Sequence, residues 1–358
     1  LRQIDQILLG GLPSLTPTCD ALNSERLTFV GHQHERRAPV ANNADLSPGQ
    51  DDGRSILHAD SDRSWVARER TEESSTIGRV VVVLCGVNRH PAGDWATVAV
   101  ALHPGGVVRS AALGDAHAAR DRFSITAGTD PAARFEATPE RVTVTIDDVS
   151  VDLRTTEPFP WPKRFGGGGV FSAVPYLNQY WHPYRLGGAA TGVVDHDGEP
   201  WRLDGATLYC ERNWGAGFPD RWWWGQAHDF DGEDASVAFS GGLLRLGPLG
   251  RDVNGVVVRL GPRVIRLTPP MPTRSEISAD SWRLVARSPR FHIELEGDGA
   301  GREPHVLPVP LPAERRNVDT DFEHLAGRLH CRVRERGRVI FDATSLLAGL
   351  EIGSLPGR

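Results

Sequence analysis

Apolar and polar residues alternate along much of the chain, in short runs separated by glycine, proline and aspartate. In the run RVTVTIDD, Val142, Val144 and Ile146 fall at every second position, with Thr143 and Thr145 between them. This period of two places apolar side chains on one face of a β-strand. Because several such runs follow one another and convincing helical periodicity is nearly absent, the pattern predicts an all-β fold of sandwich or barrel type.

The alternating runs begin only after residue 78, and this divides the chain. Residues 1–78 contain two aromatic side chains, show no sustained period of 2 or 3.6, and include NNADLSPGQDDGRS, a composition typical of loops or disorder. The stretch TEPFPWPKRFGGGGVFSAVP, rich in proline and glycine, interrupts the strand pattern near residue 168. We therefore expect a poorly patterned and partly disordered N-terminal segment, a first β-domain over residues 79–168 and a second over residues 169–358.

The size and charge of the chain narrow the class of protein. At 358 residues it exceeds the length at which one hydrophobic core normally stops growing, which favours two domains or one large β architecture. A net charge of -6 and a sequence pI near 6.1 provide no basic surface for nucleic acid. No run approaches the roughly 18 apolar residues of a membrane helix, and the opening LRQIDQILLGGLPS does not resemble a signal peptide. We expect a cytoplasmic protein that can touch a membrane surface peripherally and has no nucleic-acid partner.

Neither the cysteines nor the histidines form a recognisable metal motif. The cysteines lie far apart without a CxxC pair, so we expect buried thiols rather than a zinc knuckle or a disulfide scaffold. His32 and His34 lie in the poorly patterned N-terminal part and are interpreted as a solvated loop. The run FGGGGVF lacks the Lys-Ser/Thr ending of a phosphate-binding loop. The four cysteines are Cys19, Cys85, Cys210 and Cys331.

Aromatic residues gather in the second half of the chain. All four tyrosines and eight of the ten tryptophans fall between residues 161 and 282, most densely in RWWWGQAHDF. If that run is extended, Trp222 and Trp224 share one face and Trp223 lies on the other. A strand with bulky side chains on both faces either lies between two apolar layers or lines a cavity.

A carboxyl group lies close to these aromatics in the preceding run, YCERNWG. In an extended chain Tyr209, Glu211 and Asn213 share one face, and Cys210 and Arg212 lie on the other. A phenol and an amide then flank a carboxyl on the same face, which is how a buried acid would be held.

The block LYCERNWGAGFPDRWWWGQAHDF resembles the signature of the tocopherol cyclase family, in which a Tyr-x-Glu-Lys-(Asp/Asn)-Trp-Gly segment precedes Phe-Pro, a tryptophan-rich strand and a glutamine. YLNQYWHPYRLGGAATGVV and RVIFDATSLLAGLEIG are also similar to the family, so the resemblance covers about residues 79–355. The sequence departs from the family at Arg212, which replaces a lysine, at Asn213, where an acid often stands, and in residues 1–78, which lack a Gly-Trp-Tyr-type motif. The matching positions are Tyr209, Glu211, Asn213, Trp214, Gly215, Phe218, Pro219, Trp222, Trp224 and Gln226.

The resemblance implies a fold and a reaction. The fold is two lipocalin-like antiparallel β-barrels, related more distantly to carotenoid hydratases. The expected substrate is a hydrophobic small molecule, a prenylated aromatic quinol, whose chain double bond is protonated before the phenol oxygen closes a chromanol ring. Neither a metal nor an organic cofactor is expected.

The same chemistry assigns roles to particular residue types. Protonating an alkene needs an acid sheltered from water, and Glu211 and Asp229 are the candidates because burial raises the pKa of a carboxyl group. The phenol needs a proton acceptor, for which His182 or His228 is the expected type. Aromatic faces stabilise a carbocation, and Trp214, Trp222 and Trp224 are expected to have this role. The residues expected to contact substrate are Tyr209, Asn213, Trp214, Trp222, Trp224 and Gln226.

Other interpretations of the same residues remain open at this point. A non-catalytic lipocalin-like binder of hydrophobic ligands would keep the aromatic cavity without needing an acid. A hydratase acting on an isoprenoid or carotenoid alkene would use the same acid and admit water. Tryptophan clusters in β-proteins are most often core, and the two histidines and Glu211 could serve structure alone. The sequence leaves the oligomeric state open.

Overall fold

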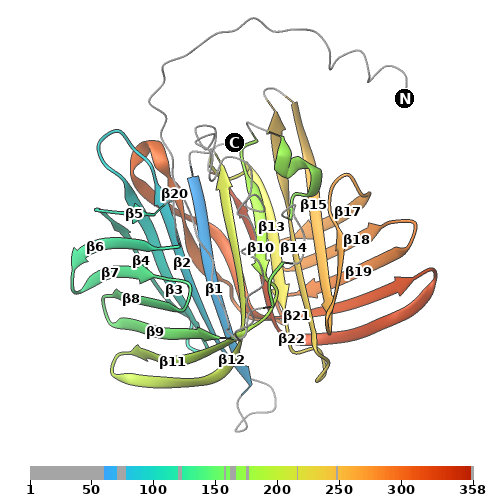
Figure 1. Cartoon of the computed structure of the whole chain (residues 1–358), viewed down its shortest axis with the longest axis horizontal. Helices are drawn as coiled ribbons and strands as arrows, with labels where there is room; N and C mark the ends of the chain where they lie inside the picture. The colour runs from blue at the N-terminus through green and yellow to red at the C-terminus, as the bar shows by residue number, and fades with distance from the viewer. Residues whose placement is uncertain are drawn as a thin grey trace, which may run out of the picture.

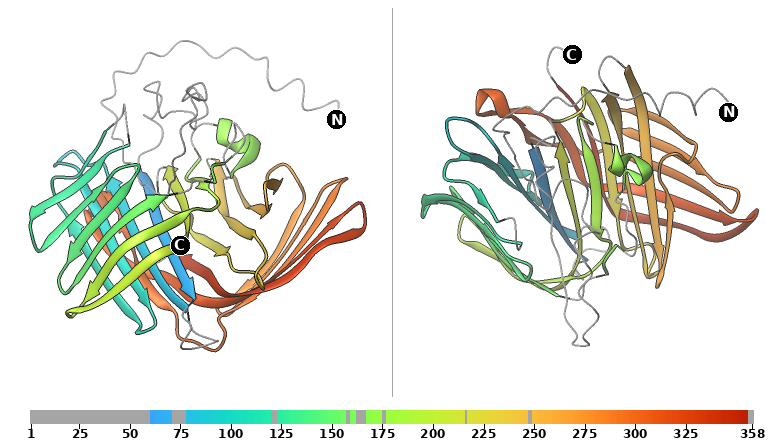
Figure 2. Two further views of the ribbon diagram at one scale, coloured as in Figure 1. Left: turned by 60° about the horizontal axis from the view of Figure 1, so that its bottom comes forward. Right: turned by 45° about the horizontal axis from the view of Figure 1, so that its top comes forward.

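The computed structural model consists almost entirely of antiparallel β-strands, which confirms the predicted all-β fold of two lipocalin-like domains (Figure 1). The strands form two large sheets, and Figure 2 shows each of them curled, one beside the other. The structure describes residues 60–70, 78–119, 123–156, 159–161, 167–174, 177–215, 217–246 and 249–355, with the backbone alone for residues 60–70. Cys19, His32 and His34 lie outside the described residues.

The first sheet has 12 strands in the order β4-β3-β2-β1-β12-β11-β9-β8-β7-β6-β5, and β10 pairs with β12. Neighbours in sequence are mostly neighbours in space, as hairpin turns such as Asp197-Gly198 require. The strands are β1 (Asp60–Arg70), β2 (Gly78–Asn88), β3 (Trp95–His103), β4 (Val107–Leu113), β5 (His117–Ala118), β6 (Ile125–Asp130), β7 (Ala133–Ala137), β8 (Arg141–Ile146), β9 (Val149–Thr156), β10 (Tyr180–Arg185), β11 (Ala189–His196) and β12 (Glu199–Gly215).

The second sheet has 10 strands in the order β16-β15-β14-β13-β22-β21-β19-β18-β17, and β20 pairs with β21. Its strands are β13 (Arg221–Ala227), β14 (Ala235–Leu246), β15 (Leu249–Leu260), β16 (Arg263–Leu267), β17 (Thr273–Ser278), β18 (Ser281–Arg287), β19 (Phe291–Asp298), β20 (His305–Leu311), β21 (Arg316–Glu335) and β22 (Arg338–Ser354). Two 3-10 helices complete the described elements, η3 (Gly169–Ala173) and η4 (Pro312–Glu314).

Two features of the topology differ from what the alternation pattern alone indicates. Strand β1 falls within the stretch without pattern, yet it lies between β2 and β12 in the first sheet. Sheet membership changes between Gly215 and Arg221, whereas the predicted domain boundary lies near residue 168. As a result β10, β11 and β12, which lie in the second half of the chain, complete the first sheet.

Strand β2 is buried on both faces, which explains its nearly continuous apolar run. Val81 and Val83 belong to the core of the first sheet, together with Phe135 from β7. Val80 and Val82 point the other way, into an apolar layer that also contains side chains from the second sheet. Fully burying a side chain such as valine or phenylalanine contributes about 1.5–3 kcal/mol, so both layers stabilise the fold substantially.

The three consecutive tryptophans of β13 are likewise buried on both faces of their strand. Trp223 lies in the core of the second sheet, where its Nε1 donates to Oδ1 of Asn254 at 2.8 Å. Trp224 lies in the apolar layer shared by the two sheets, and Trp222 is on the same face. Strands β2 and β3 of the first sheet contact β20 and β21 of the second across this layer. The aromatic motif therefore lies where the two sheets meet.

Candidate active site

A pocket lies between the two sheets, beside the shared apolar layer. Its cavity volume is about 60 Å³, and its walls come from β2, β3 and β12 on one side and from β13, β14, β20, β21 and β22 on the other. The chemistry of the pocket is set by a mixture of carboxyl, amide and indole groups on these walls. The side chains that carry these groups include Glu211, Asn213, Trp222, Trp224, Glu323 and Glu351.

Four uncharged donors hold the carboxyl group of Glu211 on β12. Nε1 of Trp181 donates to Oε2 at 2.6 Å, the hydroxyl of Tyr209 at 2.7 Å, and Nε1 of Trp224 at 2.6 Å. The amide of Asn213 donates to Oε1 at 3.1 Å. The donors come from β10, β12 and β13, so both sheets fix the position of this acid.

Burial dominates the acidity of this group. Glu211 is 5% exposed, and burial raises the pKa of its carboxyl above the ordinary glutamate value, while the hydrogen bonds from Trp181, Tyr209, Trp224 and Asn213 lower the pKa by less. Since Oε2 accepts three hydrogen bonds, a bound proton belongs on Oε1, the oxygen that Asn213 contacts.

Tyr209 keeps its proton for the same reason. Burial, followed by the nearby Glu211, raises the pKa of its phenol well above the ordinary tyrosine value. The hydroxyl therefore remains a donor to the carboxyl group across the physiological pH range.

The opposite wall carries carboxyl groups that sequence reasoning missed. Glu323 on β21 and Glu351 on β22 are paired positions in the sheet, and both line the pocket with Asp321. Nε1 of Trp222 donates to Oε1 of Glu351 at 2.5 Å. The run DTDFE indicates that Asp321 and Glu323 share a face, because residues two apart in a strand point the same way.

The pocket brings together part of the predicted site. Glu211, Asn213, Trp222 and Trp224 all line it, and Tyr209 reaches it through its hydrogen bond to Glu211. The predicted face shared by Tyr209, Glu211 and Asn213 is present as expected. Trp181 is a donor that was not among the predicted site residues, and it lies in the stretch YLNQYWHPY, within the flank that the resemblance covers.

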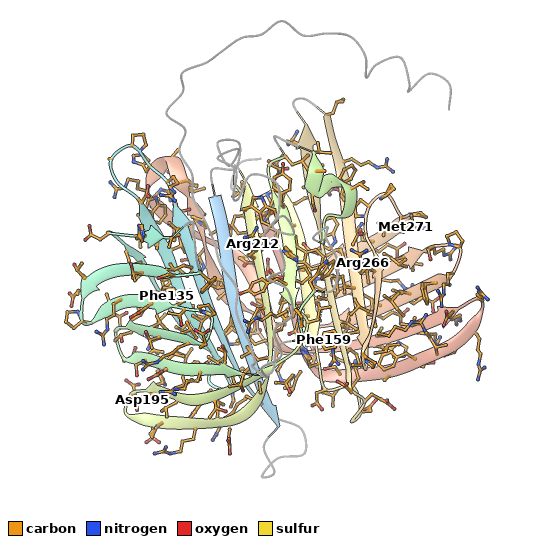
Figure 3. All side chains as sticks on the ribbon, viewed as in Figure 1. Phe135, Phe159, Asp195, Arg212, Arg266 and Met271 are labelled. Atoms are coloured by element: carbon orange, nitrogen blue, oxygen red, sulfur yellow. The ribbon has the colours of Figure 1, made fainter. Side chains whose placement is uncertain are left out.

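Trp214 lies on the other face of β12 from Glu211. Its ring stacks on Tyr180 with centroids 5.2 Å apart, and the guanidinium of Arg212 lies 4.5 Å from its centroid. Arg212 is labelled in Figure 3, among the central strands. Because residues 212 and 214 alternate with residues 211 and 213, Trp214 does not line the pocket.

The structure also places both predicted histidines outside the pocket lining. His182 is buried on β10, with its ring 5.6 Å from that of Trp161 in an edge-on arrangement. His228 is buried just beyond β13, where Nε2 lies 3.2 Å from the carbonyl oxygen of Leu186 and Nδ1 contacts the amide of Gln226. Gln226, which makes this contact, is fully buried. Neither ring is positioned by these contacts to meet a ligand beside Glu211.

The second predicted acid, Asp229, has a different local setting. It follows β13 in a turn, with a φ of 63° in the left-handed region that aspartate tolerates better than most residues. It does not line the pocket. Of the two candidate acids, Glu211 is therefore the one in contact with the pocket.

A second, mainly apolar pocket of about 60 Å³ adjoins the first, and the two share Gln179 and Ser240. The ring of Trp181 lies on its wall, so this indole borders the apolar pocket while its Nε1 holds Glu211. Gly167 makes room for the indole, because a Cβ there would lie 2.0 Å from the ring. The two pockets are therefore adjacent, and Trp181 joins the apolar one to Glu211 in the other.

Metal-ligating residues gather at one place in the described part of the chain. Asp148, His196 and Asp197 offer atoms within 4.8 Å of one another. Both carboxylate oxygens of Asp148 already accept hydrogen bonds from Arg109, at 2.5 and 2.6 Å. A guanidinium therefore occupies the position that a cation would take. Cys85, Cys210 and Cys331 are buried and form no disulfide.

Fold and site together define an all-β protein with an uncharged-donor cage around a buried acid, in a pocket between two curled sheets. The family model described as tocopherol cyclase-like matches residues 157–354, which is more than half of the chain. The chain belongs to this family. The match includes Glu211, all four of its donors and the carboxyl groups of the opposite wall.

Two curated plant relatives are similar over the same part of the chain. The probable chloroplastic tocopherol cyclase of Oryza sativa subsp. japonica is 30% identical over 207 residues, which are 54% of this chain and 43% of that protein. The chloroplastic tocopherol cyclase of Zea mays is 28% identical over 211 residues, with the same shares. The aligned part thus spans less than half the length of each relative.

Solved structures support the fold. Kievitone hydratase from Nectria haematococca is 13% identical, with a TM-score of 0.50 over 94% of this chain and 98% of that chain. CghA with Sch210972 is 12% identical, with a TM-score of 0.52 over 94% and 99% of the two chains. At these identities the likeness concerns architecture alone.

No helix in the described part of the chain is long and apolar enough to span a membrane.

Proposed function

We propose that this protein is an acid catalyst of the tocopherol cyclase type, which protonates a chain double bond of a prenylated quinol and lets the phenol oxygen close a ring. One observation carries this proposal: Glu211 is buried on the pocket wall among four uncharged donors, and burial raises the pKa of its carboxyl group. An acid that keeps its proton in an apolar setting is what alkene protonation requires.

The reaction is a redox-neutral isomerisation. The O–H bond of Glu211 breaks and a C–H bond forms at the less substituted alkene carbon, which leaves a tertiary cation on its neighbour. The phenol oxygen then bonds to that carbon and releases its proton. Trp222 and Trp224 line the pocket beside Glu211, and each indole face that meets the cation stabilises it by about 0.5–2 kcal/mol.

The three donors on Oε2 also assist the proton transfer. Once Glu211 has lost its proton, Trp181, Tyr209 and Trp224 donate to a charged carboxylate, and such hydrogen bonds are stronger than those to a neutral group. The cage therefore stabilises the state that follows protonation of the alkene, without any rearrangement.

The adjoining apolar pocket accommodates the rest of the isoprenoid chain. It is lined by side chains such as Phe171, Leu177 and Leu244, and it begins where the first pocket ends, at Gln179 and Ser240. A chain bound there leaves its aromatic head beside Glu211. The apolar lining of this pocket favours a prenylated ligand over a polar one.

The proposal is tested by incubating the full chain with prenylated quinols of several chain lengths and following ring closure by mass spectrometry and chromatography. Glu211→Gln should lower kcat by about a hundred- to ten-thousandfold, the usual contribution of a general acid, with ligand affinity nearly unchanged. Glu276→Gln, which changes an exposed glutamate paired with Arg274, is the matched control. Turnover that survives Glu211→Gln would refute this assignment, and binding of quinols without turnover by the unaltered protein would support a non-catalytic binder.

A further inference from the structure

The wall that faces Glu211 carries three carboxyl groups that take no part in the protonation of the alkene. Asp321 and Glu323 project from β21 and Glu351 from β22, and all three line the same pocket as Glu211. Asp321 is 6% exposed and Glu323 is 3% exposed. Burying carboxyl groups is costly, so their position on the wall of the same pocket as Glu211 needs a chemical explanation.

The register of the sheet fixes how these groups lie relative to one another. Glu323 and Glu351 are Cα partners across β21 and β22, and Glu351 is in turn the partner of Trp224 on β13. His305 on β20 is the partner of Glu323 on its other side. These residues form one row across the second sheet and face the first sheet. Directly opposite side chains have Cβ atoms about 4.5–5.5 Å apart, so the two glutamates are cross-strand neighbours on the pocket wall.

Two neighbouring carboxylates repel each other, so each disfavours the ionised form of the other. The indole N–H of Trp222 donates to Oε1 of Glu351 at 2.5 Å, which stabilises charge on Glu351. Burial lowers the pKa of His305, and its Nε2 lies 3.1 Å from the carbonyl oxygen of Leu102, so this ring is neutral. Glu351 therefore has a neutral donor that stabilises its charged form, the form in which a carboxyl group accepts a proton.

The proposed ring closure requires a group to accept the phenol proton. His182 and His228 have the right chemistry but do not line the pocket, and Glu211 serves as the proton donor in the proposed reaction. A carboxylate on the opposite wall is on the far side of any ligand that contacts Glu211 and can meet its hydroxyl group.

We propose that Glu351 is the catalytic base of this site and that Glu323 is a positioning residue that keeps Glu351 reactive. This inference rests on the proposed function. The phenol O–H bond breaks as the C–O bond forms, and the proton goes to Glu351. After product release, Glu351 returns a proton to solvent and Glu211 takes one up, so each turnover balances without an oxidant or reductant.

The test compares Glu351→Gln, Glu323→Gln and Glu211→Gln with the control Glu276→Gln, each as the full chain with a prenylated quinol. Glu351→Gln should lower kcat at least about a hundredfold with KM changed by less than about threefold, because the amide still accepts the bond from Trp222 but not a proton. Glu323→Gln should retain turnover and move the acidic limb of the pH profile to lower pH, since Glu351 then loses a like-charged neighbour that disfavours its ionised form.

The outcomes separate the two proposals. If Glu351→Gln turns over like the unaltered protein while Glu211→Gln does not, the base assignment is wrong and the acid mechanism stands. If neither the unaltered protein nor any variant closes a ring, the proposed function itself fails. The profile of Glu323→Gln decides the assignment should Glu351→Gln not fold, because an unmoved acidic limb overturns it.

Discussion

The indole N–H of Trp181 and the carboxylate of Glu211, 30 residues apart in sequence, are joined by a hydrogen bond of 2.6 Å between neighbouring strands. Trp181→Phe removes this donor and leaves the ring. Losing a donor to the charged form should raise the pKa of Glu211 further and move the basic limb of the activity profile up by about one pH unit.

Trp223→Phe is the matched control for that experiment. It removes an indole donor of similar burial whose partner, Asn254, lies outside the pocket. Both variants should lose roughly 1 kcal/mol of stability, but only Trp181→Phe should move the profile. Equal profiles for the two variants would mean that Trp181 has a structural role alone.

Glu211 should make the stability of the fold depend on pH. Its pKa is raised in the folded state above the ordinary value of 4.5, so the folded protein binds the proton more tightly than the unfolded chain does. The contribution of Glu211 is therefore complete below pH 4.5 and is lost as pH rises through the folded-state pKa.

Glu211→Gln should remove this dependence. Urea unfolding at pH 4.5 and pH 8 should show a smaller decline in the free energy of unfolding for Glu211→Gln than for the unaltered protein. A parallel decline in the two proteins would show that the carboxyl titrates normally despite its burial.

Asp229→Asn separates the two acids that the sequence proposes. Asparagine tolerates the left-handed backbone at this position, so the variant should fold normally. Because Asp229 does not line the pocket, turnover should stay within about twofold of the unaltered protein, measured with the same quinol panel. A loss comparable to that of Glu211→Gln would place the proton donor in the turn after β13.

Gly167 should be sensitive to the smallest enlargement. A Cβ there would lie 2.0 Å from the ring of Trp181, so Gly167→Ala must displace the indole that holds Glu211. The expected result is about 1–3 kcal/mol of destabilisation, measured by chemical denaturation, together with reduced turnover. Gly114→Ala, whose Cβ would meet nothing within 4 Å, should change the free energy of unfolding by less than about 0.5 kcal/mol.

Alternation along the chain was enough to predict the local geometry of the site. It placed Tyr209, Glu211 and Asn213 on one face and separated Trp223 from its two neighbours, and the hydrogen bonds agree. The same rule separates Trp214 from Glu211, because positions 211 and 214 have opposite parity. Parity is a local property of an extended chain, which is why it survives without knowledge of the fold.

What the sequence could not provide is the pairing between distant strands. Glu323 and Glu351 meet the aromatic motif only because β22 pairs with both β13 and β21, more than a hundred residues after Glu211. The run DSDRSWVARER of β1 lacks apolar alternation, and its place between β2 and β12 follows from backbone pairing instead. Nothing in a local pattern reports such partners.

Strands of two different sheets enclose the pocket, and this has a consequence for how such a protein can diversify. Glu211 and three of its donors lie on β10 and β12, whereas Trp222, Glu323 and Glu351 lie on strands of the other sheet. Changes on β13, β21 or β22 can reshape what the pocket accepts while the acid and most of its cage remain intact. New substrate preferences can therefore arise in one half of the molecule without rebuilding the proton donor in the other.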